Sequence, residues 1–128
     1  MKKLLLSALL LTGVATSAKA NTVTIDNQTM CTYIVHLSGL GDITVSPGVT
    51  SYTSLPGQDI FGARVYYQTA FGGGAYDGAF AVNYYYNFFN TLTGSAPLCI
   101  PASASAFYGS WWQPGSTSAN AQLTLFFM

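Results

Sequence analysis

Apolar and polar side chains alternate with a period of two along much of this chain, and that pattern restricts it to an all-β fold. The alternation is clearest in residues 119–128, where Ala, Leu, Leu and Phe fall on one side and Asn, Gln and Thr on the other. A strand places successive side chains on opposite faces, so this segment reads as half-buried in a sheet. After residue 20, no long window shows the apolar spacing of an amphipathic helix.

Turn signals divide the chain into about seven or eight strands. Pro47-Gly48 and Pro56-Gly57 close two segments, and the glycines at 72–74 close a third. The spacing predicts a small antiparallel β-sandwich, with a closed barrel as the alternative. The expected strands are 23–25, 32–37, 43–45, 49–55, 63–69, 79–89, 104–111 and 119–128.

Residues 1–20 have the features of a secretory signal peptide. Lys2 and Lys3 precede an apolar run, and Ala18-Lys19-Ala20 supplies the small residues of a cleavage site. The apolar run is shorter than the roughly 20 residues that span a bilayer, so an integral membrane anchor fits less well. Cleavage after Ala20 would leave residues 21–128 as one domain, and the short leader with two lysines suits a bacterial protein that is secreted or held at the cell surface.

Charge is scarce in residues 21–128. Arg64 is the sole lysine or arginine there, and it stands against four aspartates and no glutamate. Nucleic-acid binding requires clustered Lys and Arg to neutralise phosphates, so this class of function is excluded. Disorder is excluded as well, because 50% of the whole chain is hydrophobic.

The two cysteines predict one disulfide bond. Cys31 and Cys99 have no other partner, and an exported protein meets an oxidising compartment. Closing a loop of about 68 residues would stabilise the fold by roughly 4 kcal/mol in the chain-entropy model. Two free thiols are the alternative.

The aromatic stretch 81–89, AVNYYYNFF, raises the question of which rings are inside. Aromatic residues that alternate on a strand usually belong to the core, so we expect one row of 79–89 to be buried. That row is Phe80, Val82, Tyr84, Tyr86 and Phe88. The rest of the core is expected to include Ile34 or Val35, Val65, Leu123 and Leu125.

The opposite face of 79–89 is a candidate ligand-binding surface. Tyr85 falls there between Asn83 and Asn87, which gives an aromatic ring bordered by amides. A sugar could stack its C–H face on the ring while its hydroxyls bond the amides. Asp77, just before the strand, is a further candidate for bonding a hydroxyl.

Adjacent tryptophans supply another candidate. Trp111 and Trp112 should point to opposite sides of a strand, so one of them should face water or a ligand. We take Trp112 as the ligand-binding ring, with Trp111 as its substitute if Trp112 points inward.

No pattern predicts an enzyme, a cofactor or a metal site. Asp59 and Asp77 could act on a glycosidic bond only if their turns meet, and Asp in a turn usually bonds the backbone. His36 is the single histidine, and no Gly-x-Ser-x-Gly elbow accompanies it. The glycine-rich run 71–78, FGGGAYDG, lacks the lysine and the spacing of a nucleotide-binding loop.

Residues 23–69 resemble the N-terminal part of thaumatin-like proteins. VTIDNQTMCTYIVHL is similar to that family's opening strand pair, and TVSPGVTSYTSLPG followed by GARVYYQT is similar to a later passage. The resemblance implies an antiparallel sandwich, a first cysteine tied to the late part of the chain, and glucan binding or defence activity. The chain departs from the family in having two cysteines and no glutamate, and Arg64 alone matches a position of the family's cleft.

Three functions remain in view. The first is a non-catalytic secreted module that binds a polysaccharide or a cell-surface glycan. The second is a structural protein of the cell surface or matrix that self-associates, because the uncharged strands 81–89 and 120–128 could pair edge to edge. The third is a thaumatin-like defence or membrane-active protein.

Overall fold

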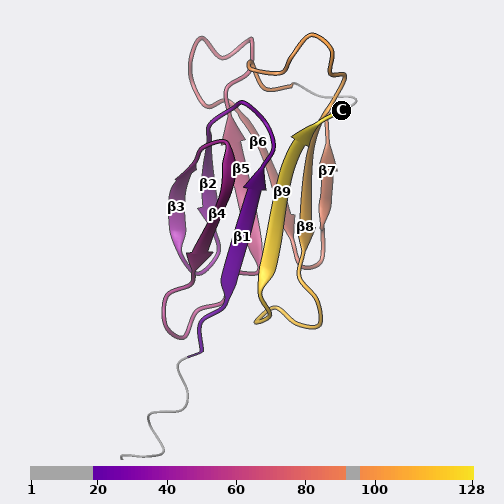
Figure 1. The fold of residues 1–128 in the computed structure, drawn as a ribbon. Coiled ribbons are helices and arrows are strands. Elements are labelled where there is room, and N and C mark those ends of the chain that lie inside the picture. Colours follow the sequence, from indigo (N-terminus) through magenta and orange to yellow (C-terminus); the bar gives the residue numbers. More distant parts are fainter. Residues whose placement is uncertain (1–18, 92–95) are drawn as a thin grey trace, which may run out of the picture.

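The computed structural model describes residues 19–91 and 96–128, and these form nine strands in two packed sheets (Figure 1). Apart from Lys19 and Ala20, the predicted signal peptide lies outside the described residues. Within the described ranges, no helix is long and apolar enough to cross a membrane. The strands are β1 (Thr22–Asn27), β2 (Tyr33–Leu37), β3 (Gly41–Val45), β4 (Gly48–Thr53), β5 (Gly62–Tyr67), β6 (Gly78–Asn83), β7 (Phe88–Asn90), β8 (Phe107–Trp112) and β9 (Ala121–Phe127).

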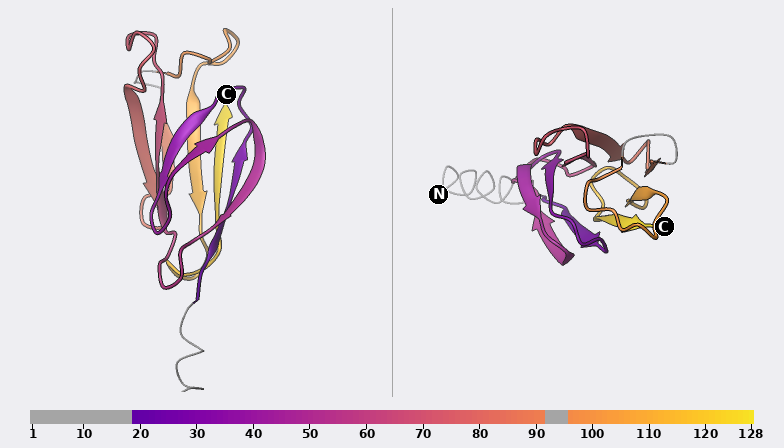
Figure 2. Two further views of the ribbon diagram at one scale, coloured as in Figure 1. Left: turned by 90° about the vertical axis from the view of Figure 1, so that its left-hand side faces the viewer. Right: turned by 90° about the horizontal axis from the view of Figure 1, so that it is seen from above.

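The two sheets form a sandwich, whose layers are seen edge-on in Figure 2. The five-stranded sheet has the order β4-β1-β9-β8-β7, and the four-stranded sheet has the order β3-β2-β5-β6. Neighbours within each sheet are antiparallel except β1 and β9, which are parallel. The predicted all-β sandwich is therefore confirmed, with one parallel pair that joins the first strand to the last.

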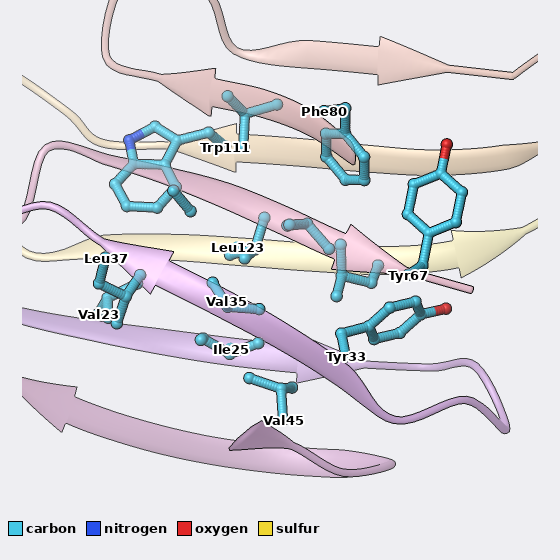
Figure 3. Close-up of a cluster of buried hydrophobic side chains, with 14 of the residues drawn as sticks. Val23, Ile25, Tyr33, Val35, Leu37, Val45, Tyr67, Phe80, Trp111 and Leu123 are labelled. Atoms are coloured by element: carbon cyan, nitrogen blue, oxygen red, sulfur yellow. The ribbon is translucent and has the colours of Figure 1, made fainter. Parts of the chain in front are cut away.

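The core lies between the sheets and is built from the apolar rows of the alternating strands (Figure 3). Val35 and Val65 face inward from the four-stranded sheet, and Leu123 and Leu125 face inward from β9, all with no exposed surface. These predicted core residues are confirmed. Trp111, Tyr33, Phe107 and Phe80 fill the rest of the interior with rings.

The predicted continuous strand 79–89 is wrong. β6 ends at Asn83, and the chain turns through residues 84–87 and crosses to the other sheet as β7. The Asn83 side chain forms this turn, because its Oδ1 accepts hydrogen bonds from the backbone N–H groups of Tyr85 and Tyr86, each at 2.8 Å. Asparagine is favoured in turns because its side chain can replace a backbone acceptor in this way.

The crossing also changes which rings are buried. Phe80 and Val82 are in the core as predicted, but Tyr84 is only partly buried, and Tyr86 and Phe88 are 62% and 46% exposed. On β7 the inward ring is Phe89 instead, which stacks on Phe80 with the ring centroids 4.2 Å apart. Inward and outward side chains do not keep one alternation through the turn, because the chain crosses from one sheet to the other. On β7 the inward side chain is therefore the odd-numbered Phe89, not the even-numbered Phe88.

Gly109 of β8 makes room for this aromatic packing. A Cβ built at Gly109 would lie 2.4 Å from an atom of the Phe80 ring. Real side chains do not approach that closely, so a ring lies where any other residue at position 109 would carry its side chain. The absence of a side chain there allows Phe80 to lie between β8 and the ring of Phe89.

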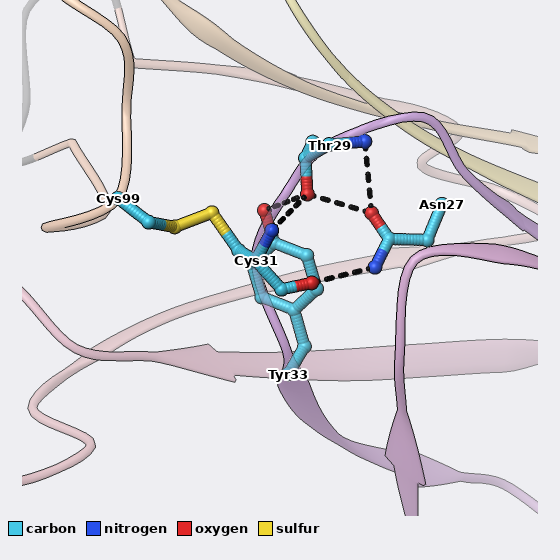
Figure 4. The surroundings of a disulfide bond; sticks show 5 residues. All are labelled: Asn27, Thr29, Cys31, Tyr33 and Cys99. Carbon is cyan, nitrogen blue, oxygen red and sulfur yellow. Dashed lines mark hydrogen bonds between the residues drawn. A yellow bond between two sulfur atoms is a disulfide. The ribbon is translucent and has the colours of Figure 1, made fainter.

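The disulfide between Cys31 and Cys99 is confirmed and closes the end of the sandwich where β1 turns into β2 (Figure 4). Asn27 donates to the Cys31 carbonyl at 2.8 Å, and Thr29 donates to Asn27 Oδ1 at 2.6 Å. Since the Thr29 hydroxyl donates there, the Tyr33 hydroxyl is the donor in the 2.8 Å bond between those two side chains. The bridge is thus backed by a buried polar network, and in an extracellular setting such a bridge would persist.

Leu123→Ala should lower the free energy of unfolding by about 2–5 kcal/mol, because it leaves a cavity in the centre of the five-stranded sheet. Gln122→Ala is the matched control, because Gln122 is the residue next to Leu123 on β9 and its side chain is exposed. This substitution should change stability by less than about 0.5 kcal/mol. Urea unfolding of both variants measures the difference. Equal, small losses would show that β9 does not contribute to the core.

Candidate functional site

A groove of about 490 Å³ opens at the end of the sandwich opposite the disulfide. Its lining residues come from the β2–β3 turn, the β4–β5 connection, the β6–β7 turn and the β8–β9 loop. Four sequence-distant segments therefore contribute to one surface. Its lining residues are Gly39, Gly57, Gln58, Asp59, Phe61, Tyr85 and Thr117.

Tyr85 is the most exposed ring of the groove, with 81% of its surface accessible. The Asn83 turn fixes its backbone, and Tyr84 supports its side chain edge to face with ring centroids 5.0 Å apart. The Tyr84 hydroxyl in turn donates to the Gly115 carbonyl at 3.4 Å. The Tyr85 ring is thus held exposed to solvent at the groove by its neighbours.

A second part of the lining comes from the β4–β5 connection, which carries Asp59 and Phe61. Phe61 is 41% exposed, and its backbone N–H donates to Ser38 Oγ at 2.8 Å. Gly39 packs against this connection: it has a φ of +72°, and a Cβ there would lie 2.5 Å from the Asp59 carbonyl oxygen. Glycine is required at position 39 on both grounds.

Two buried amides hold the floor beneath these loops. The Asn21 side chain donates to the carbonyls of Ile60 at 2.7 Å and Ala119 at 2.9 Å, and accepts from the Ile60 N–H at 2.7 Å. Gln113 Nε2 lies 2.8–2.9 Å from the carbonyls of Ile60, Thr117 and Ala119. Two of the four segments, the β4–β5 connection and the β8–β9 loop, are therefore bound to the same two side chains.

The tryptophan pair points to opposite sides, as the strand geometry predicted. Trp111 is 2% exposed and donates from its indole nitrogen to Gln113 Oε1 at 3.1 Å, so it is a core residue. Trp112 is 63% exposed on the outer face of the five-stranded sheet. It does not line the groove with Tyr85, so the two predicted rings belong to different surfaces.

Asn83 and Asn87 flank Tyr85 in the chain but do not line the groove with it. Asn83 uses its carbonyl oxygen to hold the turn. Asn87 is exposed, and its backbone carbonyl accepts from the Trp111 N–H. The predicted arrangement of the Tyr85 ring between two free amides requires a continuous strand over 79–89. The turn at residues 84–87 interrupts that strand.

Asp77 lies at the other end of the molecule, where it stabilises the β5–β6 connection. Its carboxylate accepts from the Thr69 hydroxyl at 2.5 Å and from the Thr69 N–H at 2.9 Å, and these bonds hold the pKa of Asp77 below its usual range. β5 and β6 separate it from Asp59, so the two aspartates cannot act on one bond.

A second cavity, of about 280 Å³, lies beside the disulfide and is lined by Tyr33, Tyr67, Met30 and Leu98 among others. The phenols there serve the fold. Burial raises the pKa of Tyr33 despite its bond to Thr29, and burial together with the Asp77 carboxylate raises the pKa of Tyr67. Neither hydroxyl is poised to act as a base.

The lining of the groove is both aromatic and polar. It combines two exposed aromatic rings with a carboxylate, an amide and a hydroxyl, from Asp59, Gln58 and Thr117. Sequence reasoning named Tyr85 as a ligand residue and Asp59 only as a possible catalytic partner of Asp77, and it did not name Phe61, Gln58 or Thr117. The signal available was the position of 57–61 directly after the Pro56-Gly57 turn, since loops on a rigid scaffold commonly carry binding residues.

Within the described ranges, no three His, Cys, Asp or Glu side chains gather closely enough to hold a metal ion. Comparison of the chain with protein-family models, curated proteins and solved structures finds no match.

Gln113→Leu should lower the free energy of unfolding by about 2–4 kcal/mol, because it removes the donor shared by three carbonyls. Amide exchange should also speed up in residues 57–61 and 115–119. Gln122→Leu, an exposed substitution of the same kind, should change neither. Unchanged exchange in both loops would mean that Gln113 does not fix the groove.

Proposed function

We propose that this protein is a non-catalytic binding module whose groove takes a carbohydrate. One observation carries the proposal: Tyr85 and Phe61 expose large ring areas beside hydrogen-bonding side chains in a hollow of about 490 Å³. Binding pockets pair apolar and aromatic lining with a few placed polar groups in this way. The proposal rests on the groove and takes nothing from the resemblance of residues 23–69 to thaumatin-like proteins.

A sugar fits this combination because one side of a pyranose ring carries C–H groups and its edge carries hydroxyls. The C–H face can stack on the Tyr85 ring, and the hydroxyls can bond Gln58, Asp59 and Thr117. Gly39 and Gly57 carry no side chains into the groove, so a ligand can approach the backbone at these points. The buried amides of Asn21 and Gln113 hold the β4–β5 connection and the β8–β9 loop in place before a ligand binds. Such preorganisation reduces the conformational entropy lost on binding.

A secreted or cell-surface location is part of this proposal. The disulfide is compatible with an extracellular protein. A glycan of the cell surface or matrix is a hydroxyl-rich ligand that such a module would meet.

Tyr85→Ala should weaken glycan binding by about 1–3 kcal/mol without unfolding the protein, since the ring is exposed and stacks on ligand. Tyr86→Ala is the matched control, because Tyr86 is the next residue of the same turn, is 62% exposed and does not line the groove. Pull-down on insoluble glucans, chitin and peptidoglycan, with circular dichroism to monitor folding, provides the measurement.

Trp112→Ala separates the two surfaces in the same assay. If Trp112→Ala weakens binding and Tyr85→Ala does not, the ligand binds the outer face of the five-stranded sheet and the groove proposal is wrong. Failure of the wild-type protein to bind any of the polymers would also contradict it.

Self-association is a second candidate, and a specific observation favours it. Phe88, Tyr108 and Phe126 lie in a row across β7, β8 and β9 on the outer face of the sheet, with ring centroids 5.7 and 5.1 Å apart. The outward residues of these three strands include no charged side chain. A second copy could bury this face.

The contact that this row favours is the face of the sheet. Residues 120–128 are predicted to pair edge to edge, but β9 lies between β1 and β8 and has no free edge. Residues 81–89 do not form one strand, although β6 and β7 are each the last strand of a sheet among the described residues.

Phe126→Lys should abolish any concentration-dependent increase in mass seen by light scattering, because it places a charge in the aromatic row. Gln122→Lys, outward on the same strand, is the control and should have a smaller effect. A wild-type protein that stays monomeric at the highest soluble concentration would end this alternative.

A further inference from the structure

Asp59 differs from the other three aspartates because its carboxylate has no partner among the described residues. Asp26 accepts from Gln28 at 2.8 Å, Asp42 contacts His36 at 2.6 Å, and Asp77 is bonded by Thr69. Asp59 lines the groove together with Phe61 and Tyr85. The one carboxylate left without a partner in the described fold is therefore the one at the candidate binding site.

The groove also lacks any positive charge that could neutralise Asp59. Arg64 lies on the outer face of the four-stranded sheet, where its guanidinium carbon is 5.6 Å from the centre of the Tyr66 ring. None of the lining residues is basic. Asp59 is therefore the one charged side chain of the lining, and the exposed faces of Tyr85 and Phe61 can add attraction for a cation.

From this we infer that the groove selects a glycan built of amino sugars with free amines, such as a glucosamine polymer. This inference rests on the proposed carbohydrate-binding function and names its substrate class. The sugar ring stacks on Tyr85, and the protonated amine pairs with the Asp59 carboxylate in a charge-assisted hydrogen bond. No covalent step is involved.

The acetylated form of the same sugar should bind less well. An acetamide has no charge, so its binding would remove water from the Asp59 carboxylate without supplying a counter-charge. An anionic glycan would be repelled. A divalent metal ion is a poor alternative occupant, because Ca²⁺ requires about 6–8 oxygen ligands and the groove offers one carboxylate.

The test measures, by isothermal titration calorimetry, the affinity of the protein for tetrasaccharides of glucosamine, of N-acetylglucosamine and of glucose. The pH is one at which the glucosamine amine is protonated. We expect the glucosamine tetramer to bind about tenfold more tightly than the acetylated one. Raising the salt concentration should weaken only the glucosamine interaction.

Asp59→Asn should remove the preference and leave the affinity for the two neutral tetramers nearly unchanged. Asp42→Asn is the matched control, because Asp42 is exposed on β3 and does not line the groove. This variant should keep the preference for the glucosamine tetramer. If Asp59→Asn fails to fold, the salt dependence of the wild-type protein decides, and a salt-independent preference overturns the inference.

The outcomes separate the inference from the proposed function. Equal affinity for all three tetramers overturns the amino-sugar inference and leaves carbohydrate binding in place, whereas binding of none overturns both. Choline serves as a further probe, and if it binds as tightly as the glucosamine tetramer, the site recognises a cation and not a sugar.

Discussion

The buried amides of Asn21 and Gln113 connect three sequence-distant parts of this structure through shared backbone partners. Both side chains donate to the carbonyls of Ile60 and Ala119, so they tie the start of β1 to the loops before β5 and β9. Within the described part of the chain, every buried side-chain nitrogen and oxygen has a partner. Such satisfied networks are rigid, and replacing one amide would leave several buried carbonyls without a donor. The sandwich is closed at this end by hydrogen bonds and at the other by a disulfide.

The aromatic core places a second constraint on the fold. Phe107 is fully buried and meets Tyr33 face to face at 5.4 Å, with Tyr67 and Phe80 at its edges. Rings of this size need close approach, which Gly109 permits by offering bare backbone to Phe80. Because these rings occupy the interior, the tyrosines of residues 84–86 remain outside, where the turn displays them.

The scarcity of charge gives the few charged residues a clear meaning. In an ordinary domain, an exposed carboxylate has little significance, because charges of both signs surround it. Here three of the four aspartates are engaged locally with a turn, a neighbouring strand or a hydrogen-bonding side chain. Asp59 alone is left for a ligand, and it lies in the hollow that also exposes Tyr85 and Phe61. The inference about amino sugars depends on this contrast.

The sequence by itself determined the strand content, the disulfide and most of the core, because a period of two is a local property that any sheet must respect. It also determined that the side chains of Trp111 and Trp112 would point to opposite faces of a strand, though not which of them would be buried. The tertiary structure decided that residues 84–87 would turn, since the Asn83 turn serves a crossing between sheets that no local pattern specifies. It also brought together Gly39, Asp59, Tyr85 and Thr117, which lie far apart in the chain. A binding groove made of loop ends depends on how the sheets are connected and closed, so its members could be identified only once the sandwich was assembled.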